Sequence, residues 1–464
     1  MPLFNPARCR ADLGDVPAAR RQQRHLDPPI FPLANDLRDL REQHRQVRNS
    51  RHLQGDSGSL LRALDGFPRR DGHHSNRCGQ AVAITLTVQI ASRSQTATVN
   101  ADALSSGTVE GLAMVMVLFD VLTPKQALLF WAVGKELKER GIEVSYVGRR
   151  YAQLDWVERA LGIELKPLGE FGGGTLEGKL LASTERQRLL AEEVIASRPD
   201  VTVSSGSVEL CRVSYGLGIR HVLVSDSPHS PVNRIAVPLS DLVATPAFIP
   251  LAEWRRWCVR NVRVLRYRAL DPVAWMRRLG DLTANGQAPE GDYFLVRPTE
   301  HMASYSLGRG LAETLSVVEG LLSLSDARVV VLARYPEDVA ELRRLYDPRV
   351  EVVAEPRLAL PLISRALAVF SGGGTMAQEA ALLGVPVFSY YPGELPAVHR
   401  FLVRRGLLSV LSDLSRESIG RAVAAAADRR FRRRLAERAR RLRESMEDPA
   451  VVVAEAIANL AGRR

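Results

Sequence analysis

The feature that most constrains the fold is a regular alternation of buried strands and amphipathic helices, which begins near Val115 and continues to the C-terminus. The first unit shows the pattern: 115–121 predicts a buried strand, 123–141 an amphipathic helix, and 143–149 a second strand. Apolar strands that alternate with helices through short loops form a parallel sheet covered on both faces. This part of the chain therefore predicts an α/β fold.

The alternation occurs in two series, so we predict two Rossmann-like, doubly wound lobes. The first lobe occupies residues 113–285, and the second, with the terminal helices, occupies residues 286–464. An Arg- and Trp-rich stretch at 254–268 precedes the expected linker at 281–292. Two such lobes place a cleft between the carboxyl ends of their sheets, where ligands of open α/β folds bind. The last helices could cross back to the first lobe.

Residues 1–112 lack this alternation. Arg, His, Gln, Pro and Asp follow one another without helical or strand period, and only 81–91 is typical of a strand or two. Two interpretations stay open, a disordered extension or a start assigned upstream of a true one at Met114 or Met116; a small accessory domain is favoured less. Five histidines in this region have spacings that match no metal site and are expected to be solvated: His25, His44, His52, His73 and His74.

The net charge of +11 raises the question of a polyanionic partner. Arg and Glu are dispersed along predicted helices instead of gathered with aromatic residues in one patch, so we do not expect nucleic-acid binding. A basic surface also suits small ligands that carry phosphate. The Arg run of the C-terminal helices is interpreted as a solvated helix face. Peripheral contact with a membrane stays open as the more specific alternative.

The four cysteines lie far apart without a CxxC pair, so the sequence predicts neither a zinc site nor a disulfide framework, and reduced cytosol is the expected compartment. Asp120 and Lys125 interrupt the only long apolar candidate, so no membrane span is predicted, and the start shows no signal-peptide pattern. We expect no cofactor and no metal. The oligomeric state cannot be read from the sequence, and a homodimer stays open.

The most informative segment is FSGGGTMAQEAALLGVPVFSYYPGE at 370–394. A buried strand ends in three glycines, and the helix that follows should direct unsatisfied backbone N–H groups and its positive dipole end at the cleft. Phosphate is the expected occupant, and Glu379 could accept hydrogen bonds from a ribose diol. The alternative is a tight turn with a solvent-facing Glu379. The predicted binding residues of this segment are Gly373, Gly374, Thr375, Gln378 and Glu379.

This segment resembles the donor-nucleotide motif of MurG-like glycosyltransferases and of UDP-N-acetylglucosamine 2-epimerases, in which a Glu at the position of Glu379 contacts the ribose. The chain is more similar still to the mainly archaeal family known as domain of unknown function 354. That resemblance covers about residues 115–440 and rests on FDVLTPKQALLF, SDSPHSPVNRIAVPLSDLVATPAFIP, FLVRPTEHMASY and the glycine-rich segment. The likeness to the glycosyltransferases and the epimerases implies a GT-B-like fold that binds a nucleoside diphosphate sugar, with a UDP-sugar as the expected ligand.

Polar residues that directly follow strands provide further candidates in the first lobe. Asp120, Thr123 and Lys125 come after the first strand, at the cleft edge where acceptor or sugar contacts arise. Thr123 as a helix cap and Lys125 as a surface charge are the alternatives. The loop FGGGT at 171–175 precedes a helix predicted from Ser183; the loop could close over the cleft or could serve as a linker.

Asp226 and His229 form the best acid/base pair of the sequence, because His titrates near neutrality and a nearby carboxylate can orient it. Loop capping by Asp226 beside an uninvolved His229 stays open. Arg297, at the end of the first strand of the second lobe, could clamp a phosphate or form a salt bridge between the lobes.

These features predict a GT-B-type glycosyltransferase in which a helix N-terminus and Arg stabilise the leaving nucleoside diphosphate without an obligatory metal. The predicted catalytic residues are Asp120, Asp226 and His229. Epimerisation is an alternative, but it requires acid/base groups on both sides of the sugar. A non-catalytic nucleotide-sugar-binding protein is another alternative. A dinucleotide-dependent redox enzyme is disfavoured, because LTPK and not GxGxxG follows the first strand.

Overall fold

The computed structural model describes residues 83–90, 93–100, 114–150, 154–258, 262–279, 288–300, 311–391 and 393–462. Before Glu110, β1 (Ala83–Ile90) pairs antiparallel with β2 (Arg93–Asn100). β1 confirms a strand in the apolar segment at 81–91, whereas β2 follows that segment and was not predicted. The other interpretations of residues 1–112, including those of the five histidines, concern residues outside the described ranges.

The first large sheet has seven parallel strands, and the chain enters it at its centre with β3. In spatial order the strands are β5 (Leu165–Glu170), β4 (Glu143–Arg150), β3 (Met116–Val121), β6 (Val201–Ser204), β7 (Arg220–Val224), β8 (Leu242–Pro246) and β9 (Arg263–Tyr267). β9 comes from the Arg- and Trp-rich stretch that the sequence analysis left unassigned. It is an edge strand, so Arg263 and Arg266 can remain exposed while its partner β8 is buried.

Seven described helices belong to this lobe: α4 (Pro124–Glu139), α5 (Asp155–Leu161), α6 (Leu176–Ser197), α7 (Val208–Leu217), α8 (Asn233–Ala236), α9 (Leu251–Arg255) and α10 (Pro272–Leu279). α4 begins as predicted after Thr123, whose side chain accepts a hydrogen bond from the backbone N–H of Gln126. α6 begins two turns before the predicted Ser183, because Thr175 caps it by accepting from the backbone N–H of Gly178.

The second large sheet repeats the design with six parallel strands: β12 (Val350–Val353), β11 (Arg328–Leu332), β10 (Tyr293–Arg297), β13 (Ala368–Ser371), β14 (Val387–Ser389) and β15 (Ser409–Val410). Its described helices are α12 (Ala312–Leu324), α13 (Pro336–Arg343), α14 (Leu360–Arg365), α15 (Thr375–Leu383), α16 (Ala397–Arg404) and α17 (Arg416–Ala427). Two doubly wound sheets confirm the predicted α/β fold with two Rossmann-like lobes.

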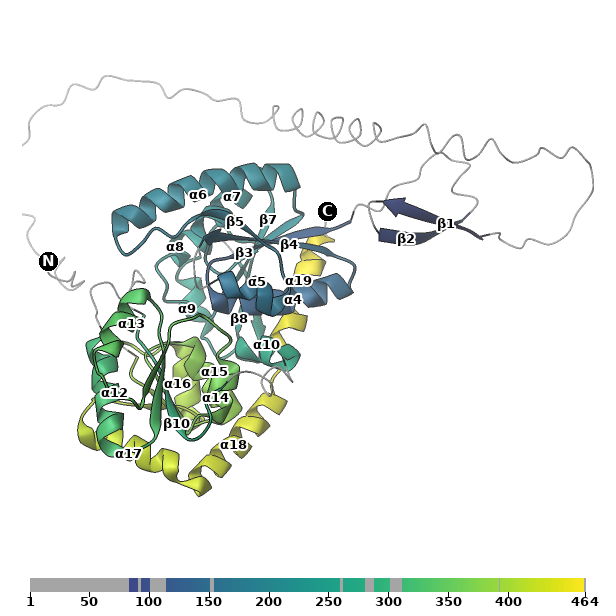
Figure 1. The fold of residues 1–464 in the computed structure, drawn as a ribbon. Helices are drawn as coiled ribbons and strands as arrows, with labels where there is room; N and C mark the ends of the chain where they lie inside the picture. The colour runs from purple at the N-terminus through teal and green to yellow at the C-terminus, as the bar shows by residue number, and fades with distance from the viewer. Residues whose placement is uncertain are drawn as a thin grey trace, which may run out of the picture. The chain divides into compact units, whose positions relative to one another are not determined.

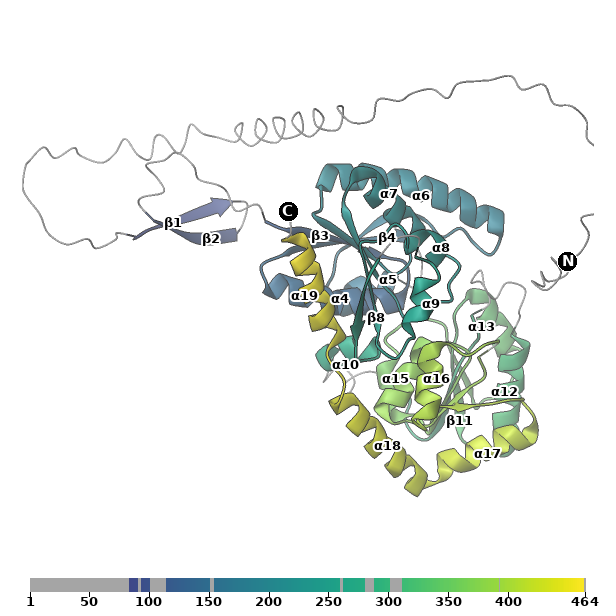
Figure 2. The same cartoon turned by 180° about the vertical axis from the view of Figure 1, so that it is seen from behind.

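The last two helices connect the lobes. α18 (Arg429–Glu444) packs against α15, whereas α19 (Pro449–Ala461) packs against α4 and reaches β6 and β7 (Figures 1 and 2). The guanidinium group of Arg220 donates a hydrogen bond to the carbonyl of Leu460. The chain therefore returns to the first lobe at its end, which is the crossing that the sequence left open.

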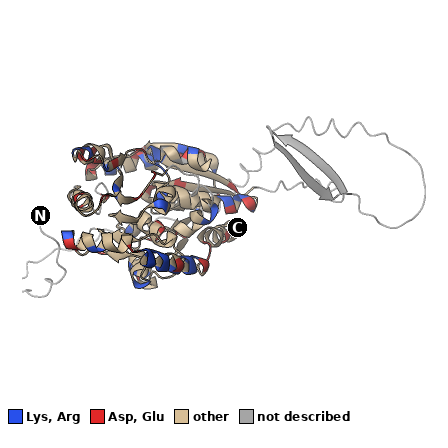
Figure 3. Cartoon of the chain, turned by 60° about the horizontal axis from the view of Figure 1, so that its bottom comes forward, with Lys and Arg blue, Asp and Glu red and all other residues tan. Residues whose placement is uncertain are grey.

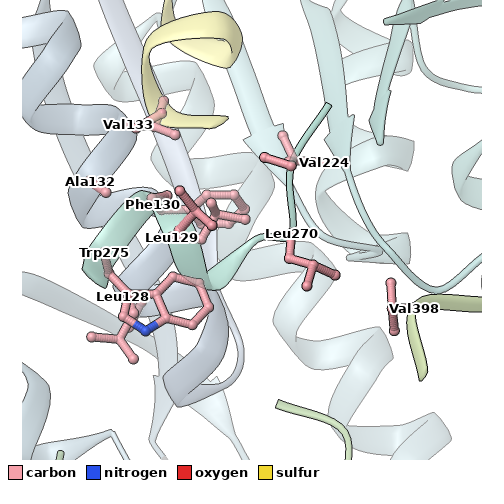
Figure 4. Packing of buried hydrophobic residues seen from close by; sticks show 14 of the residues in the cluster. Leu128, Leu129, Phe130, Ala132, Val133, Val224, Leu270, Trp275 and Val398 are labelled. Carbon is pink, nitrogen blue, oxygen red and sulfur yellow. The ribbon is translucent and has the colours of Figure 1, made fainter. Parts of the chain in front are cut away.

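Each sheet is covered on both faces by apolar side chains. The largest core cluster includes residues of both lobes, and Figure 4 shows Trp275 of α10 beside Leu128 and Leu129 of α4. Two smaller clusters cover the opposite faces of the two sheets. Trp275 is fully buried, and burial of one such side chain contributes about 1.5–3 kcal/mol. Its indole therefore fixes the position of α10 between the lobes.

Lys and Arg alternate with Asp and Glu along the ribbon of the described residues (Figure 3). In α18, Arg440 forms ion pairs with Glu437 and Glu444, and Arg441 pairs with Glu437. These pairs agree with a solvated face for the Arg run. Within the described ranges, no helix combines the length and the apolar character that a bilayer crossing requires.

Candidate functional site

A cleft of about 550 Å³ is lined by both lobes. The strand order of the first sheet reverses beside β3, and that of the second reverses beside β10. Loops after β3, β6 and β7 face loops after β10, β11 and β13 across the cleft. Ligands of doubly wound sheets bind at such reversal points, outside the carboxyl ends of the strands. The topology therefore places this cleft where a ligand is expected.

The glycine-rich turn after β13 forms one wall of the cleft. A Cβ on Gly372 would lie 2.4 Å from Cγ2 of Thr299 and 2.8 Å from the backbone N of Thr299, so only glycine allows this close approach. Gly374 is the N-cap of α15 and supplies no side chain to the first N–H groups of the helix. An uncapped helix N-terminus that lines a cleft is suited to an anion such as phosphate.

Two arginines lie beside this turn. Arg297 Nη1 donates to the carbonyl oxygens of Leu332 and Ala333 at 2.8 and 3.0 Å. Arg334 Nε donates to the carbonyl of Pro298 at 3.0 Å, and a Cβ on Gly373 would lie only 2.4 Å from Arg334 Nη2. Arg297 was predicted from the sequence, whereas Arg334 was not, although Arg334 also follows the end of a strand in the second series.

Glu379 lies on α15 and is 3% exposed, so the alternative of a solvent-facing Glu379 is wrong. Its Oε1 accepts a hydrogen bond from Trp275 Nε1 at 2.9 Å. Burial, opposed by this bond and by the charge of Arg297, raises the pKa of Glu379 to about 7. Trp275 belongs to the first-lobe helix α10, so this hydrogen bond links the two lobes at the cleft.

Lys125 stands between two carboxylates of the first lobe. Its Nζ lies 2.6 Å from Asp226 Oδ1 and 2.9 Å from Asp271 Oδ2. Gln378 Nε2 donates to Asp226 Oδ2 at 3.3 Å, and Tyr267 donates its hydroxyl hydrogen to Asp271 Oδ1 at 2.6 Å. Two ion pairs to buried carboxylates make Lys125 an internal cation, which excludes the alternative of a simple surface charge.

Burial and pairing act in opposite directions on these groups. Burial disfavours the charge of Lys125, but Asp226 and Asp271 outweigh it and raise the Lys125 pKa. Burial likewise opposes ionisation of Asp226, yet Lys125 holds the pKa of Asp226 below its usual range. At Asp271 burial prevails, and with the nearby Asp226 it raises the pKa of Asp271. Sequence analysis missed Asp271 because it follows β9, the strand that was not predicted.

The predicted acid/base pair is not joined by a hydrogen bond. Asp226 accepts from Lys125, Gln378 and Ser227, and none of the hydrogen bonds of the described residues links it to the ring of His229. His229 is exposed and lines the cleft. Partial burial of its ring, opposed by the charge of Asp226, keeps the pKa of His229 below its ordinary value. The lowered pKa favours the neutral form of the His229 ring, which is the form that can accept a proton.

Asp120 is placed differently from the prediction. It is fully buried and forms a bidentate ion pair with Arg186, at 2.9 Å to Nη1 and 2.5 Å to Nη2, and it does not line the cleft. We therefore assign Asp120 no part in the chemistry. Thr123 both caps α4 and lines the cleft. The predicted binding residues that line the cleft are Thr123, Lys125, Arg297, Gly373, Gly374, Thr375, Gln378 and Glu379.

Among the described residues, no cluster of three or more His, Cys, Asp or Glu side chains could hold a metal ion.

Residues 116–461 match a family described as "Protein of unknown function (DUF354)". The chain belongs to the DUF354 family. An uncharacterized protein of Methanocaldococcus jannaschii is 26% identical to this DUF354 chain over an alignment of 314 residues, and the match covers 64% of this chain and 88% of that protein. The resemblance proposed from the sequence motifs is thus confirmed.

Solved structures similar to the DUF354 chain include epimerases and a glycosyltransferase. Each of the three structures that follow covers 75% of this chain. The UDP-GlcNAc 2-epimerase of M. jannaschii in complex with UDP-GlcNAc and UDP has a TM-score of 0.55, 15% identity and 99% of its chain covered. The Neisseria meningitidis UDP-GlcNAc 2-epimerase bound to UDP-GlcNAc has a TM-score of 0.53, 15% identity and 100% of its chain covered. The glycotransferase of kitacinnamycin has a TM-score of 0.50, 16% identity and 99% of its chain covered. At these identities the similarity establishes the GT-B-like fold.

Proposed function

We propose that this DUF354 protein is a glycosyltransferase that binds a nucleoside diphosphate sugar, with a UDP-sugar as the expected donor. The observation that carries the proposal is the convergence of three features on one cleft. An uncapped helix N-terminus, two arginines and a buried carboxylate come from the second lobe. The helix N-terminus and the arginines are suited to the diphosphate of a donor, and the carboxylate is suited to its ribose. The similar structures that hold UDP or UDP-GlcNAc support uracil as the nucleobase of the donor.

In this proposal the second lobe supplies electrostatic catalysis. As the bond between the sugar and the diphosphate breaks, negative charge grows on the leaving phosphate. The N-terminus of α15, together with Arg297 and Arg334, would stabilise that charge. Glu379 would accept a hydrogen bond from a ribose hydroxyl while Trp275 holds its other oxygen.

The first lobe supplies the proton acceptor. His229 is exposed in the cleft with a lowered pKa, so its neutral ring would take the proton of an acceptor hydroxyl as that oxygen attacks the sugar. Asp226 already binds Lys125 and Gln378. These contacts suit it to a structural role in the cleft wall and not to the role of proton acceptor. His229 is therefore the base we propose.

Epimerisation of a nucleotide sugar is the second candidate. The observation that favours it is the pair of buried carboxylates, Asp226 and Asp271, which share Lys125 at the cleft wall. A protein that binds the same ligand without turnover is the remaining alternative, and it shares the donor site with both enzymes.

The test is a calorimetric titration of the full chain with UDP and with UDP-GlcNAc, for the wild type, Glu379→Gln and the exposed control Glu417→Gln. Glu417 is 83% exposed on α17 and does not line the cleft, so its substitution should leave binding unchanged. We expect micromolar binding, weakened about tenfold by Glu379→Gln, which corresponds to roughly 1.4 kcal/mol. A folded wild-type protein without affinity for any nucleotide would contradict the proposal.

Product analysis separates the three functions. Conversion of the sugar without an acceptor would identify an epimerase, and UDP release that depends on an added acceptor would identify a transferase. Tight nucleotide binding without either product, across an acceptor screen, would leave the non-catalytic alternative.

A further inference from the structure

One helix of the second lobe carries a charge that the proposed function does not use. α18 contains nine Arg and two Glu in 16 residues, and it lies along the outside of the second lobe (Figures 1 and 2). None of its residues lines the cleft between the lobes. Leu435, Ala439 and Leu442 pack in the core on the inner side of the helix, so its outer side faces solvent.

The outer side of α18 consists almost entirely of Arg. Its exposed residues are Arg, apart from one Ala and one Glu. Arg429 and Arg433 lie four residues apart, as do Arg430 and Arg434, which places them on two neighbouring rows of one helix side. We call the surface formed by these four residues the arginine face.

The two halves of α18 differ in how far this charge is compensated. In the C-terminal half, Glu437 and Glu444 form ion pairs with neighbouring Arg side chains. Within the described ranges, no ion pair or hydrogen bond engages the side chains of the arginine face. Asp428 precedes them as the N-cap, and its carboxylate accepts from the backbone N–H of Arg430. The arginine face therefore presents four cations beside one carboxylate.

The end of α16 extends this positive surface. Arg438 Nη1 donates to the carbonyl oxygens of Arg405 and Gly406 at 3.4 and 3.2 Å, so the end of α16 adjoins α18. Arg404 and Arg405 are exposed there, and the guanidinium group of Arg405 lies 5.1 Å from the centre of the Phe401 ring. The positive charge thus continues from one helix onto the next.

The composition of the arginine face favours one kind of anionic partner. Single-stranded nucleic acid is bound through bases that stack on aromatic side chains, but Phe431, the one aromatic residue of α18, packs on the core. A protein partner would need large apolar anchors, which the exposed residues of α18 do not supply. A bilayer with anionic headgroups requires neither, because it attracts clustered Arg side chains by charge alone.

We propose that the arginine face docks this protein on an anionic lipid bilayer. This inference does not depend on the proposed function. Each basic side chain near such a surface strengthens binding about fivefold, so the four Arg together provide a reversible attachment. Because the face offers no large apolar side chain to the hydrocarbon, the attachment is electrostatic, and added salt should weaken it.

The test is co-sedimentation of the full chain with phosphatidylcholine vesicles that do or do not contain phosphatidylglycerol. The arginine-face variant combines Arg429→Gln, Arg430→Gln, Arg433→Gln and Arg434→Gln. The matched control removes the same number of positive charges from exposed positions on other helices and strands, and it combines Arg150→Gln, Arg159→Gln, Arg188→Gln and Arg344→Gln. The two variants therefore have equal net charge and differ only in where the charge was removed.

We expect the wild type to bind only the vesicles with phosphatidylglycerol and to lose this binding in concentrated salt. The arginine-face variant should bind them at least about a hundredfold more weakly, since four basic side chains are lost, while the control binds like the wild type. Equal melting temperatures of the wild type and the arginine-face variant, followed by circular dichroism, will show that the loss does not come from unfolding.

Three results would overturn the inference. The first is a wild type that binds neither kind of vesicle. The second is an equal loss of binding in both variants, which would assign the attraction to net charge and not to the arginine face. The third is binding to duplex DNA without binding to vesicles, which would identify a nucleic-acid partner instead of a bilayer.

Discussion

Ionisable side chains at the base of the cleft depend on their buried partners for their charge states. Lys125 satisfies two buried carboxylates at once, and Glu379 is buried with one tryptophan hydrogen bond. Removal of one partner of such a set leaves a buried charge without compensation, which costs more than the pair itself contributes. Substitutions here should therefore change stability as well as ligand binding.

Lys125→Met should lower the free energy of unfolding by about 3–5 kcal/mol, because Asp226 and Asp271 lose their common cation. Urea denaturation followed by circular dichroism measures this change. Lys138→Met, on the exposed face of the same helix, is the control. Addition of Asp271→Asn to Lys125→Met should recover part of the loss. Equal stability of Lys125→Met and Lys138→Met would show that the ion pairs contribute little.

Glu379 should make stability depend on pH. Its pKa of about 7 in the folded state exceeds its ordinary value of 4.5, so the folded state binds the proton more tightly than the unfolded chain does. Stability from this group is fully present below pH 4.5 and is lost as pH rises through 7, by about 3 kcal/mol. Glu379→Gln should flatten the curve of unfolding free energy against pH in that window.

The control for this titration is Glu355→Gln, which should leave the slope unchanged because Glu355 is exposed. A Glu379→Gln curve parallel to that of the wild type would mean that the carboxyl group titrates normally.

At the scale of single residues, the sequence predicted those site residues that belong to a pattern of neighbours in the chain. Gly373, Gly374 and Glu379 were placed at the cleft correctly because strand, glycine turn and helix follow one another in the chain. Trp275 and Arg334 were missed because their importance depends on which side chain lies opposite them in the folded protein. Asp226 was placed correctly in the cleft, but its partner is Lys125 and not His229, and no spacing in the sequence encodes that choice.

At the scale of elements, the turn from β13 into α15 has room for a methyl group at Gly374 but not at Gly372. Gly372→Ala should destabilise the protein by about 1–3 kcal/mol, because its Cβ would collide with the backbone of Thr299. Gly374→Ala should fold normally, since nothing lies within 4 Å of a Cβ there and its φ of −80° suits alanine. Thermal unfolding of the two variants, side by side, measures the difference. Equal melting temperatures would contradict the close packing of Gly372 on Thr299.

The elements themselves were largely predictable, because apolar strands and amphipathic helices have different periods. Two of the differences have physical reasons. β9 was missed since an edge strand can carry exposed Arg side chains between apolar ones. The start of α6 was placed too late because glycines at 172–174 suggested a loop up to Ser183, whereas Thr175 caps the helix immediately after them.

For the whole molecule, the C-terminal helix α19 is a structural part of the first lobe. Val453→Asp would bury a carboxylate against α4, which should cost at least about 3 kcal/mol and expose the first lobe to proteolysis. Glu455→Ala, on the exposed face of α19, should have no such effect. Limited proteolysis with mass spectrometry measures both, and a first lobe equally resistant in the two variants would show that α19 docking is dispensable.

Because α19 completes the first lobe, the order in which the chain leaves the ribosome differs from the order in which the lobes can close. The first sheet emerges early but lacks the helix that covers α4 until residue 461 has been made. The second lobe has its last packed helix, α18, by residue 444. Domains usually fold in the order of synthesis. In this protein the lobe that is made first must wait, with an apolar face open, until α19 has been synthesised.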